Sequence, residues 1–172
     1  MKQIRIDNLE LKTFTLQDAE DYCLLNNINQ DNIIELYLHK NELTDISGIK
    51  LFKNLKRLYL AYNKINNISD IENLKSLNIL ALAVNNISDI SFLKNLKDLK
   101  KLYLGFNKIK DISFIKDLNK IEFLNIENLE LESDQIQYIQ SLKKLKELWC
   151  ENGFKDIKII KKLDKKIYKV LK

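Results

Sequence analysis

The sequence predicts a single α/β domain shaped as a right-handed solenoid, with short parallel β-strands on its concave face. Three observations predict it. A motif recurs every 22 residues, two of its apolar positions alternate as in a short strand, and each strand is followed by a return path of apolar residues at every third position. The 172 residues suffice for one continuous core. We expect one domain built of stacked units.

Residues 1–32 are predicted to form an N-terminal capping repeat. The stretch "IRIDNLEL" from Ile4 follows the motif, but Leu9 stands where the regular units have Asn. A helical insert is expected after Thr15, with Asp18 three residues on as a capping-box variant. The apolar stripe expected on this helix consists of Leu16, Ala19, Cys23 and Leu24.

Residues 33–120 hold four regular repeats with the pattern LxxLxLxxNxIxDIxxLxxL. The units begin at Ile33, Leu55, Leu77 and Leu99. The fourth and sixth positions alternate as one face of a strand and are expected to point into the core. On the return path Ile46, Ile49 and Phe52 recur every three residues, which favours a 3₁₀ segment over an α-helix.

Every regular unit has Asn at its ninth position. These residues are Asn41, Asn63, Asn85 and Asn107. The chain must turn there beneath a buried backbone, and an Asn side chain offers both a donor and an acceptor to peptide groups that lack partners. We therefore expect the four Asn to form a structural ladder.

Residues 121–144 read as a modified repeat and residues 145–172 as the last repeat with a C-terminal cap. The stretch "LNIENLEL" from Leu124 is similar to the first unit, and Leu129 again replaces the Asn. A second helical insert is expected after Ser133, with the apolar stripe Ile136, Ile139 and Leu142. Atypical units at both ends are typical of repeat proteins, because the ends of the core must be sealed.

The pattern resembles the leucine-rich repeat, in the 22-residue form shared by bacterial internalins and the phosphatase-regulating class of eukaryotic repeat proteins. The stretch "NNISDISFLKNLKDL" from Asn85 is most similar to internalins. Internalins are secreted and often carry Pro after "DIS", whereas this chain has no Pro and no apolar run after Met1. A role in cell-surface invasion is therefore not carried over, and we expect a cytoplasmic protein.

No arrangement typical of a catalytic, metal or cofactor site is visible. Three glycines are scattered, and Cys23 and Cys150 stand far apart without a CxxC spacing, as expected of buried thiols. His39 falls on an outward strand position with no identifiable partner, and is expected to be a surface residue. One carboxylate recurs at the thirteenth position and is expected to be a turn residue; examples are Asp45, Asp89 and Asp111. We expect no enzymatic activity and no cofactor.

The outward strand positions and the loops that follow them are rich in aromatic and basic residues, and predict a binding surface. Its expected members are Tyr37, Arg57, Tyr59, Tyr62, Ile79, Val84, Lys101, Tyr103, Phe106, Phe123 and Trp149. An aromatic centre with a charged rim is typical of protein interfaces. The alternative is that the rings stack across strands and only stabilise the sheet. We favour binding, because stacking does not explain Ile79 and Val84, which are expected to be exposed beside the rings.

The segment from Lys155 to Lys172 is basic and has two interpretations. It contains eight Lys and two Asp, whereas the remaining 154 residues carry 21 basic and 22 acidic residues. The apolar residues recur at three- or four-residue steps, as in a cap with a solvated face; they are Ile157, Ile160, Leu163, Ile167 and Val170. The alternative is contact with nucleic acid or an anionic membrane. We expect an adaptor, inhibitor or regulatory subunit that is a monomer when free and binds a protein of unknown identity.

Overall fold

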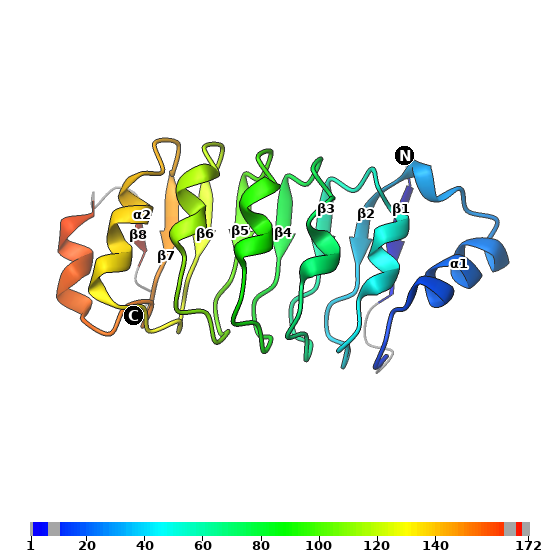
Figure 1. The fold of residues 1–172 in the computed structure, drawn as a ribbon, viewed down its shortest axis with the longest axis horizontal. Helices are drawn as coiled ribbons and strands as arrows, with labels where there is room; N and C mark the ends of the chain where they lie inside the picture. The colour runs from blue at the N-terminus through cyan, green and yellow to red at the C-terminus, as the bar shows by residue number, and fades with distance from the viewer. Residues whose placement is uncertain (1, 7–10, 164–167, 170–172) are drawn as a thin grey trace.

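The protein forms a right-handed solenoid with one open parallel sheet along its concave face (Figure 1). A computed structural model describes residues 2–6, 11–163 and 168–169. Within them the sheet has eight strands that lie side by side in chain order. The strands are β1 (Lys2–Arg5), β2 (Ile33–Tyr37), β3 (Arg57–Tyr59), β4 (Ile79–Ala81), β5 (Lys101–Tyr103), β6 (Phe123–Asn125), β7 (Glu147–Trp149) and β8 (Tyr168–Lys169).

The strand register pairs residues at the same repeat position of neighbouring coils, as the 22-residue spacing predicts. Leu36 lies opposite Leu58, and Leu58 lies opposite Leu80. These side chains are fully buried, together with the leucines at the sixth position. Because alternate strand residues point to opposite faces, the residues between them face the concave side.

The return paths are short 3₁₀ segments, which confirms the three-residue period. In the four regular coils they are Ser47–Leu51, Ser69–Ile71, Ser91–Asn95 and Ser113–Asp117. Others are Gln30–Asn32, Ser133–Gln135 and Ile157–Lys162. The Asp45 carboxylate accepts a hydrogen bond from the Ser47 amide at 2.8 Å. Asp89 and Asp111 likewise accept hydrogen bonds from the backbone amides two residues later in the chain. These carboxylates are therefore turn residues, as expected.

Both predicted helical inserts are present: α1 spans Leu16–Leu25 and α2 spans Ile136–Gln140. The Asp18 amide donates to Thr15 Oγ1 and the Thr15 amide donates to Asp18 Oδ2, which completes the expected capping box. The predicted stripe on α1 is partly wrong. Ala19 and Cys23 are buried, but Leu16 is exposed and Leu24 is 81% exposed. At the end of the solenoid α1 has a packing partner on one side only, so it buries a narrower face than an internal helix would.

The four ladder Asn side chains join neighbouring coils. Asn85 Nδ2 donates to the carbonyl oxygens of Leu60 and Leu82, each at 3.0 Å, and Asn85 Oδ1 accepts from the Ile65 amide at 3.0 Å. Asn41, Asn63 and Asn107 repeat this arrangement one coil apart. Each Asn side chain thus supplies hydrogen-bond partners to peptide groups of its own coil and of the preceding coil.

The described part of the basic C-terminal segment packs onto the last coil. Ile160 and Leu163 are buried, while Ile157 is 62% exposed. The Lys155 ammonium forms an ion pair with Glu132, and β8 extends the sheet beside β7. The remaining members of the predicted apolar series, Ile167 and Val170, lie outside the described residues.

Candidate partner-binding face

The residues at the third and fifth repeat positions line the concave face in lateral rows. The register places Tyr37 beside Tyr59, Tyr59 beside Ala81 and Ala81 beside Tyr103. The same row continues to Asn125 and Trp149. The small side chain of Ala81 therefore separates an aromatic group on β2 and β3 from a second one on β5 to β7.

Both aromatic groups are stacked across strands. The Tyr37 and Tyr59 rings lie 4.5 Å apart between centroids and almost parallel, at 5°. In the second group the centroid of Phe123 lies 4.6 Å from that of Tyr103 and 5.2 Å from that of Trp149. Ring contacts of this kind stabilise a sheet by about 0.5–1 kcal/mol per pair. The stacking interpretation therefore accounts for part of the aromatic content.

A polar network holds the first aromatic group. Glu35 is buried and accepts hydrogen bonds from the Tyr37 hydroxyl at 2.6 Å and from the Arg57 guanidinium at 2.7 Å. The Arg57 hydrogen bond is the main cause that lowers the pKa of Glu35. The hydrogen bond to Glu35 is the main cause that raises the pKa of Tyr37 to about 12. The guanidinium of Arg5 lies 5.1 Å from the Tyr37 ring centroid.

The predicted surface residues differ widely in exposure. Phe123 is only 7% exposed, so it supports its neighbouring rings and presents little surface to a partner. The expectation that Ile79 and Val84 are exposed is wrong, since both are half-buried. Lys101 is exposed and forms no ion pair with any residue that the structure describes. The polar network leaves Arg57 with less freedom to reach a partner than Lys101 has.

The most exposed aromatic members follow the strands, at the eighth repeat position. Tyr62 is 55% exposed and Phe106 is 50% exposed. The backbone φ angles are 60° at Tyr62, 59° at Val84 and 58° at Phe106. This left-handed conformation is rare for non-glycine residues and least suited to β-branched or bulky ones. We call the row Tyr62, Val84 and Phe106 the aromatic ridge.

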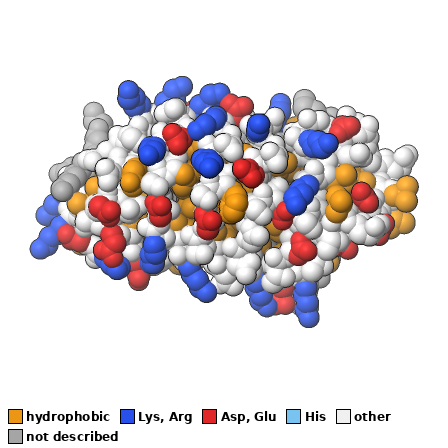
Figure 2. Space-filling view, viewed as in Figure 1, with side chains coloured by type: hydrophobic (Ala, Val, Ile, Leu, Met, Phe, Trp, Pro, Cys, Tyr) orange, Lys and Arg blue, Asp and Glu red, His pale blue; other side chains and the backbone are white. Residues whose placement is uncertain are grey.

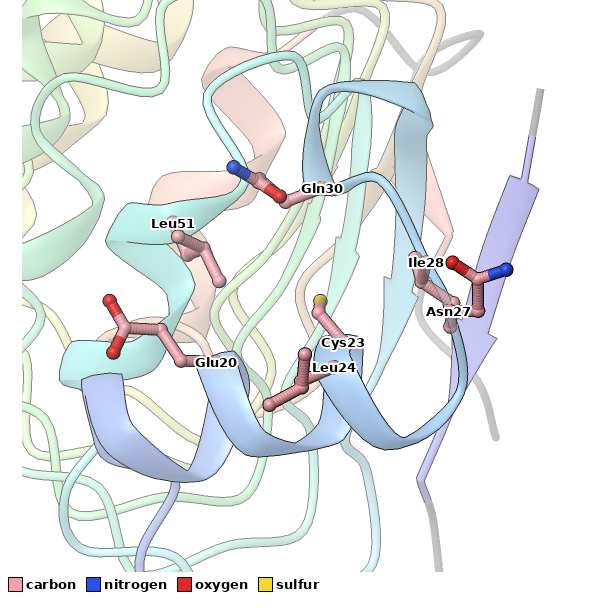
Figure 3. A pocket seen from close by; sticks show the side chains of 7 residues that line it. All are labelled: Glu20, Cys23, Leu24, Asn27, Ile28, Gln30 and Leu51. Atoms are coloured by element: carbon pink, nitrogen blue, oxygen red, sulfur yellow. The ribbon is translucent and has the colours of Figure 1, made fainter.

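Sequence reasoning missed a second surface feature, at the N-terminal end. A pocket of about 300 Å³ lies between α1 and the 3₁₀ segment Ser47–Leu51, with Cys23, Leu24 and Leu51 among its lining (Figure 3). Figure 2 shows the side that carries the 3₁₀ segments, where Lys and Arg side chains line the long edges and apolar side chains are exposed at the α1 end. The adjacent pair Leu24 and Leu25 could have indicated this feature in the sequence, because a helix that packs on one side only cannot bury two consecutive leucines.

The described residues contain no cluster of side chains arranged as a metal site. Among them no group of three or more His, Cys, Asp or Glu side chains is placed to hold a metal ion. The His39 ring makes an edge contact with Tyr37, with 6.1 Å between centroids. Burial raises the pKa of the Cys150 thiol to about 11. No helix in the described ranges has the length and apolar character needed to cross a membrane.

A stack of 22-residue coils with a parallel sheet along one side defines a solenoid repeat protein, a class that offers an extended concave binding surface. The family model described as "Leucine Rich repeats (2 copies)" matches residues 31–76, 53–95 and 73–120. The chain belongs to the leucine-rich repeat family. Proteins with this fold are commonly protein–protein interaction modules and are typically not enzymes.

Solved structures confirm the internalin-like form of the repeat. An internalin (inlF) of Listeria monocytogenes is 26% identical, with a TM-score of 0.76; the match covers 95% of this chain and 44% of that one. Internalin C2 of the same species is 26% identical, with a TM-score of 0.76 over 96% of this chain and 69% of that one. A leucine-rich repeat protein of Leptospira interrogans is 29% identical, with a TM-score of 0.73 over 86% and 36%. A comparison with curated proteins finds no match.

Proposed function

We propose that this chain is a non-enzymatic interaction module that binds a protein partner on the aromatic concave face, as an adaptor, an inhibitor or a regulatory subunit. The aromatic ridge is the observation that carries the proposal. Tyr62 and Phe106 expose about half of their surface and also hold a left-handed backbone. Neither property stabilises the free protein, whereas exposed aromatic residues at the centre of an apolar surface are typical anchors of protein interfaces.

The stacked rings have a supporting part in this proposal. Cross-strand stacking and the network around Glu35 fix the rings of Tyr37 and Tyr59, which reduces the side-chain entropy lost on binding. Phe123 supports Tyr103 and Trp149 in the same way. We therefore propose the ridge and the partly exposed rings as the contact surface, and the buried ring of Phe123 as its support.

The basic C-terminal segment has less support as a second site. In its described part Lys155 is engaged with Glu132, and three apolar side chains face the core: Ile159, Ile160 and Leu163. Binding of nucleic acid or membrane through this segment would weaken steeply with salt, whereas binding through an aromatic face would respond little. The cytoplasmic location expected from the sequence stays a prediction.

Affinity capture with matched variants tests the proposal. The full chain, a Tyr62→Ser/Phe106→Ser variant and a Leu24→Ser/Leu25→Ser variant are immobilised at equal density and exposed to lysate. Both variants lose exposed apolar area, but only the first alters the concave face. We expect the ridge variant to bind the captured protein at least tenfold more weakly and the α1 variant to bind it like the wild type. Equal binding by the ridge variant would exclude the concave face.

A further inference from the structure

The three residues of the aromatic ridge lie in one line along the solenoid axis. The Tyr62 amide donates to the Ala83 carbonyl at 3.0 Å, and the Val84 amide donates to the Gly105 carbonyl at 2.9 Å, so the lateral hydrogen bonding of the sheet continues past the strands. Adjacent parallel chains are about 4.8 Å apart. Successive ridge residues therefore repeat at that spacing, with the half-buried Val84 between two exposed rings.

We infer that the ridge binds an acidic, amphipathic α-helix of the partner, lying along the solenoid axis. An α-helix rises about 1.5 Å per residue, so apolar residues at i+3 and i+7 lie about 4.5 and 10.5 Å from residue i along the axis. These positions are within about 1 Å of the next two coils, which lie at about 4.8 and 9.6 Å. Side chains on one face of an extended strand repeat at about 6.7 Å, so the second of them would already lie about 2 Å beyond the neighbouring coil. This inference rests on the proposed function and specifies the partner that it requires.

The surface beside the ridge allows a helix to approach closely. At the seventh position of the same coils stand Ala61, Ala83 and Gly105, the smallest residues available. The apolar stripe of an amphipathic helix is about 100° wide, which is enough to cover the ridge and these small residues together. A polyproline segment repeats every 9.3 Å or so and would reach Tyr62 and Phe106, two coils apart, but would leave Val84 uncovered.

Lysine side chains beside the ridge favour an acidic helix. Lys40 holds the eighth position one coil before Tyr62, and Lys108 follows Phe106 two residues later. Both are exposed, and neither forms an ion pair within the described ranges. Lys64 lies between them and pairs with Glu42 at 3.0 Å. Carboxylates flanking the apolar stripe of the partner helix would meet these ammonium groups and speed the association.

Peptide selection against the full chain tests the helical form. Random 16-residue peptides displayed on phage are selected on the wild type and counter-selected on a Tyr62→Asn/Phe106→Asn variant. We expect the enriched peptides to be acidic, with apolar residues spaced by three or four positions. As synthetic peptides they should become helical on binding by circular dichroism, bind the variant at least tenfold more weakly, and lose binding when a central residue is replaced by Pro.

A charge exchange tests the acidic character. Lys40→Glu with Lys108→Glu should weaken binding of the acidic peptides severalfold and strengthen binding of versions whose carboxylates are replaced by Lys. The control is Lys75→Glu with Lys94→Glu, two exposed lysines on the return-path side, which changes the net charge equally and should leave both peptide versions unaffected. Equal responses of the two lysine pairs would overturn the acidic assignment.

The outcomes separate this inference from the proposed function. Enriched peptides that need Tyr62 and Phe106 but are proline-rich or alternate in polarity would refute the helix and leave the concave-face function standing. Peptides that bind the ridge variant as well as the wild type would refute both. Failure to enrich any peptide would overturn the helix inference, because a single helix should be available within the displayed length.

Discussion

Replacing Phe106 by Asn tests whether the ridge serves the fold or a partner. The ring is 50% exposed and its residue has a φ of 58°. Full burial of a Phe side chain contributes about 3 kcal/mol, so the half-buried ring contributes about 1.5 kcal/mol. A left-handed backbone costs a non-glycine residue about 1–2 kcal/mol, and Asn tolerates it better. We expect the two effects largely to cancel, with a change in unfolding free energy within about 1 kcal/mol.

The chain supplies an internal precedent for this substitution. Asn128 holds the same repeat position in the next coil, with a φ of 53°. Urea unfolding of the wild type, Phe106→Asn and Phe123→Ala on the same day provides the comparison. Truncation of the buried Phe123 should cost about 3–5 kcal/mol, since it leaves a cavity between Tyr103 and Trp149. A loss above about 2 kcal/mol for Phe106→Asn would refute our reasoning and make the ring a structural element.

Three further changes probe the scaffold. Asn85→Leu removes three hydrogen bonds to buried backbone groups and should cost about 3 kcal/mol or more in urea unfolding; an unchanged midpoint would remove the ladder from the account. Tyr37 has a pKa of about 12, above the unfolded value of about 10, so its contribution is complete below about pH 10 and is lost as the pH rises toward 12. Tyr37→Phe should flatten that alkaline decline, and an equally steep decline in the variant would show that other groups cause it. Gly105→Ala places a methyl group against Asn125 Oδ1 and the Glu127 carbonyl oxygen and should cost about 1–3 kcal/mol; an unchanged melting temperature would contradict this close packing.

The fold could be predicted because each unit repeats the same residue pattern at the same spacing. The apolar strand positions, the return path and the ladder Asn recur four times, so a misreading in one unit is corrected by the others. The strand register follows directly from the 22-residue period, and Leu58 lies opposite Leu80 as that period requires. Where the period ends, prediction weakened. The exposure of Leu24 depends on how much neighbouring structure covers α1, and a periodic pattern carries no such information.

The candidate site was predictable as a set of outward positions but not in its internal arrangement. The period places Tyr37 and Tyr59 side by side, yet the hydrogen bonds that tie Tyr37 and Arg57 to Glu35 depend on side-chain rotamers. The buried state of Phe123 likewise depends on the rings on both sides of it. Sequence position indicates the face of the sheet, whereas exposure is decided by neighbours one coil away.

The left-handed backbone distinguishes the ridge residues from the aromatic residues that stack across the strands of this face. At the eighth position the last two coils hold Asn128 and Asn152, the residue type that best tolerates a positive φ. The middle coils hold Tyr, Val and Phe at φ values near 60°, against local preference. The stacked rings on the strands meet no such conflict, because aromatic residues favour extended backbone. Departures from local preference concentrate at functional sites in folded proteins. We therefore propose the ridge, rather than the stacked rings, as the part of the concave face that contacts a partner.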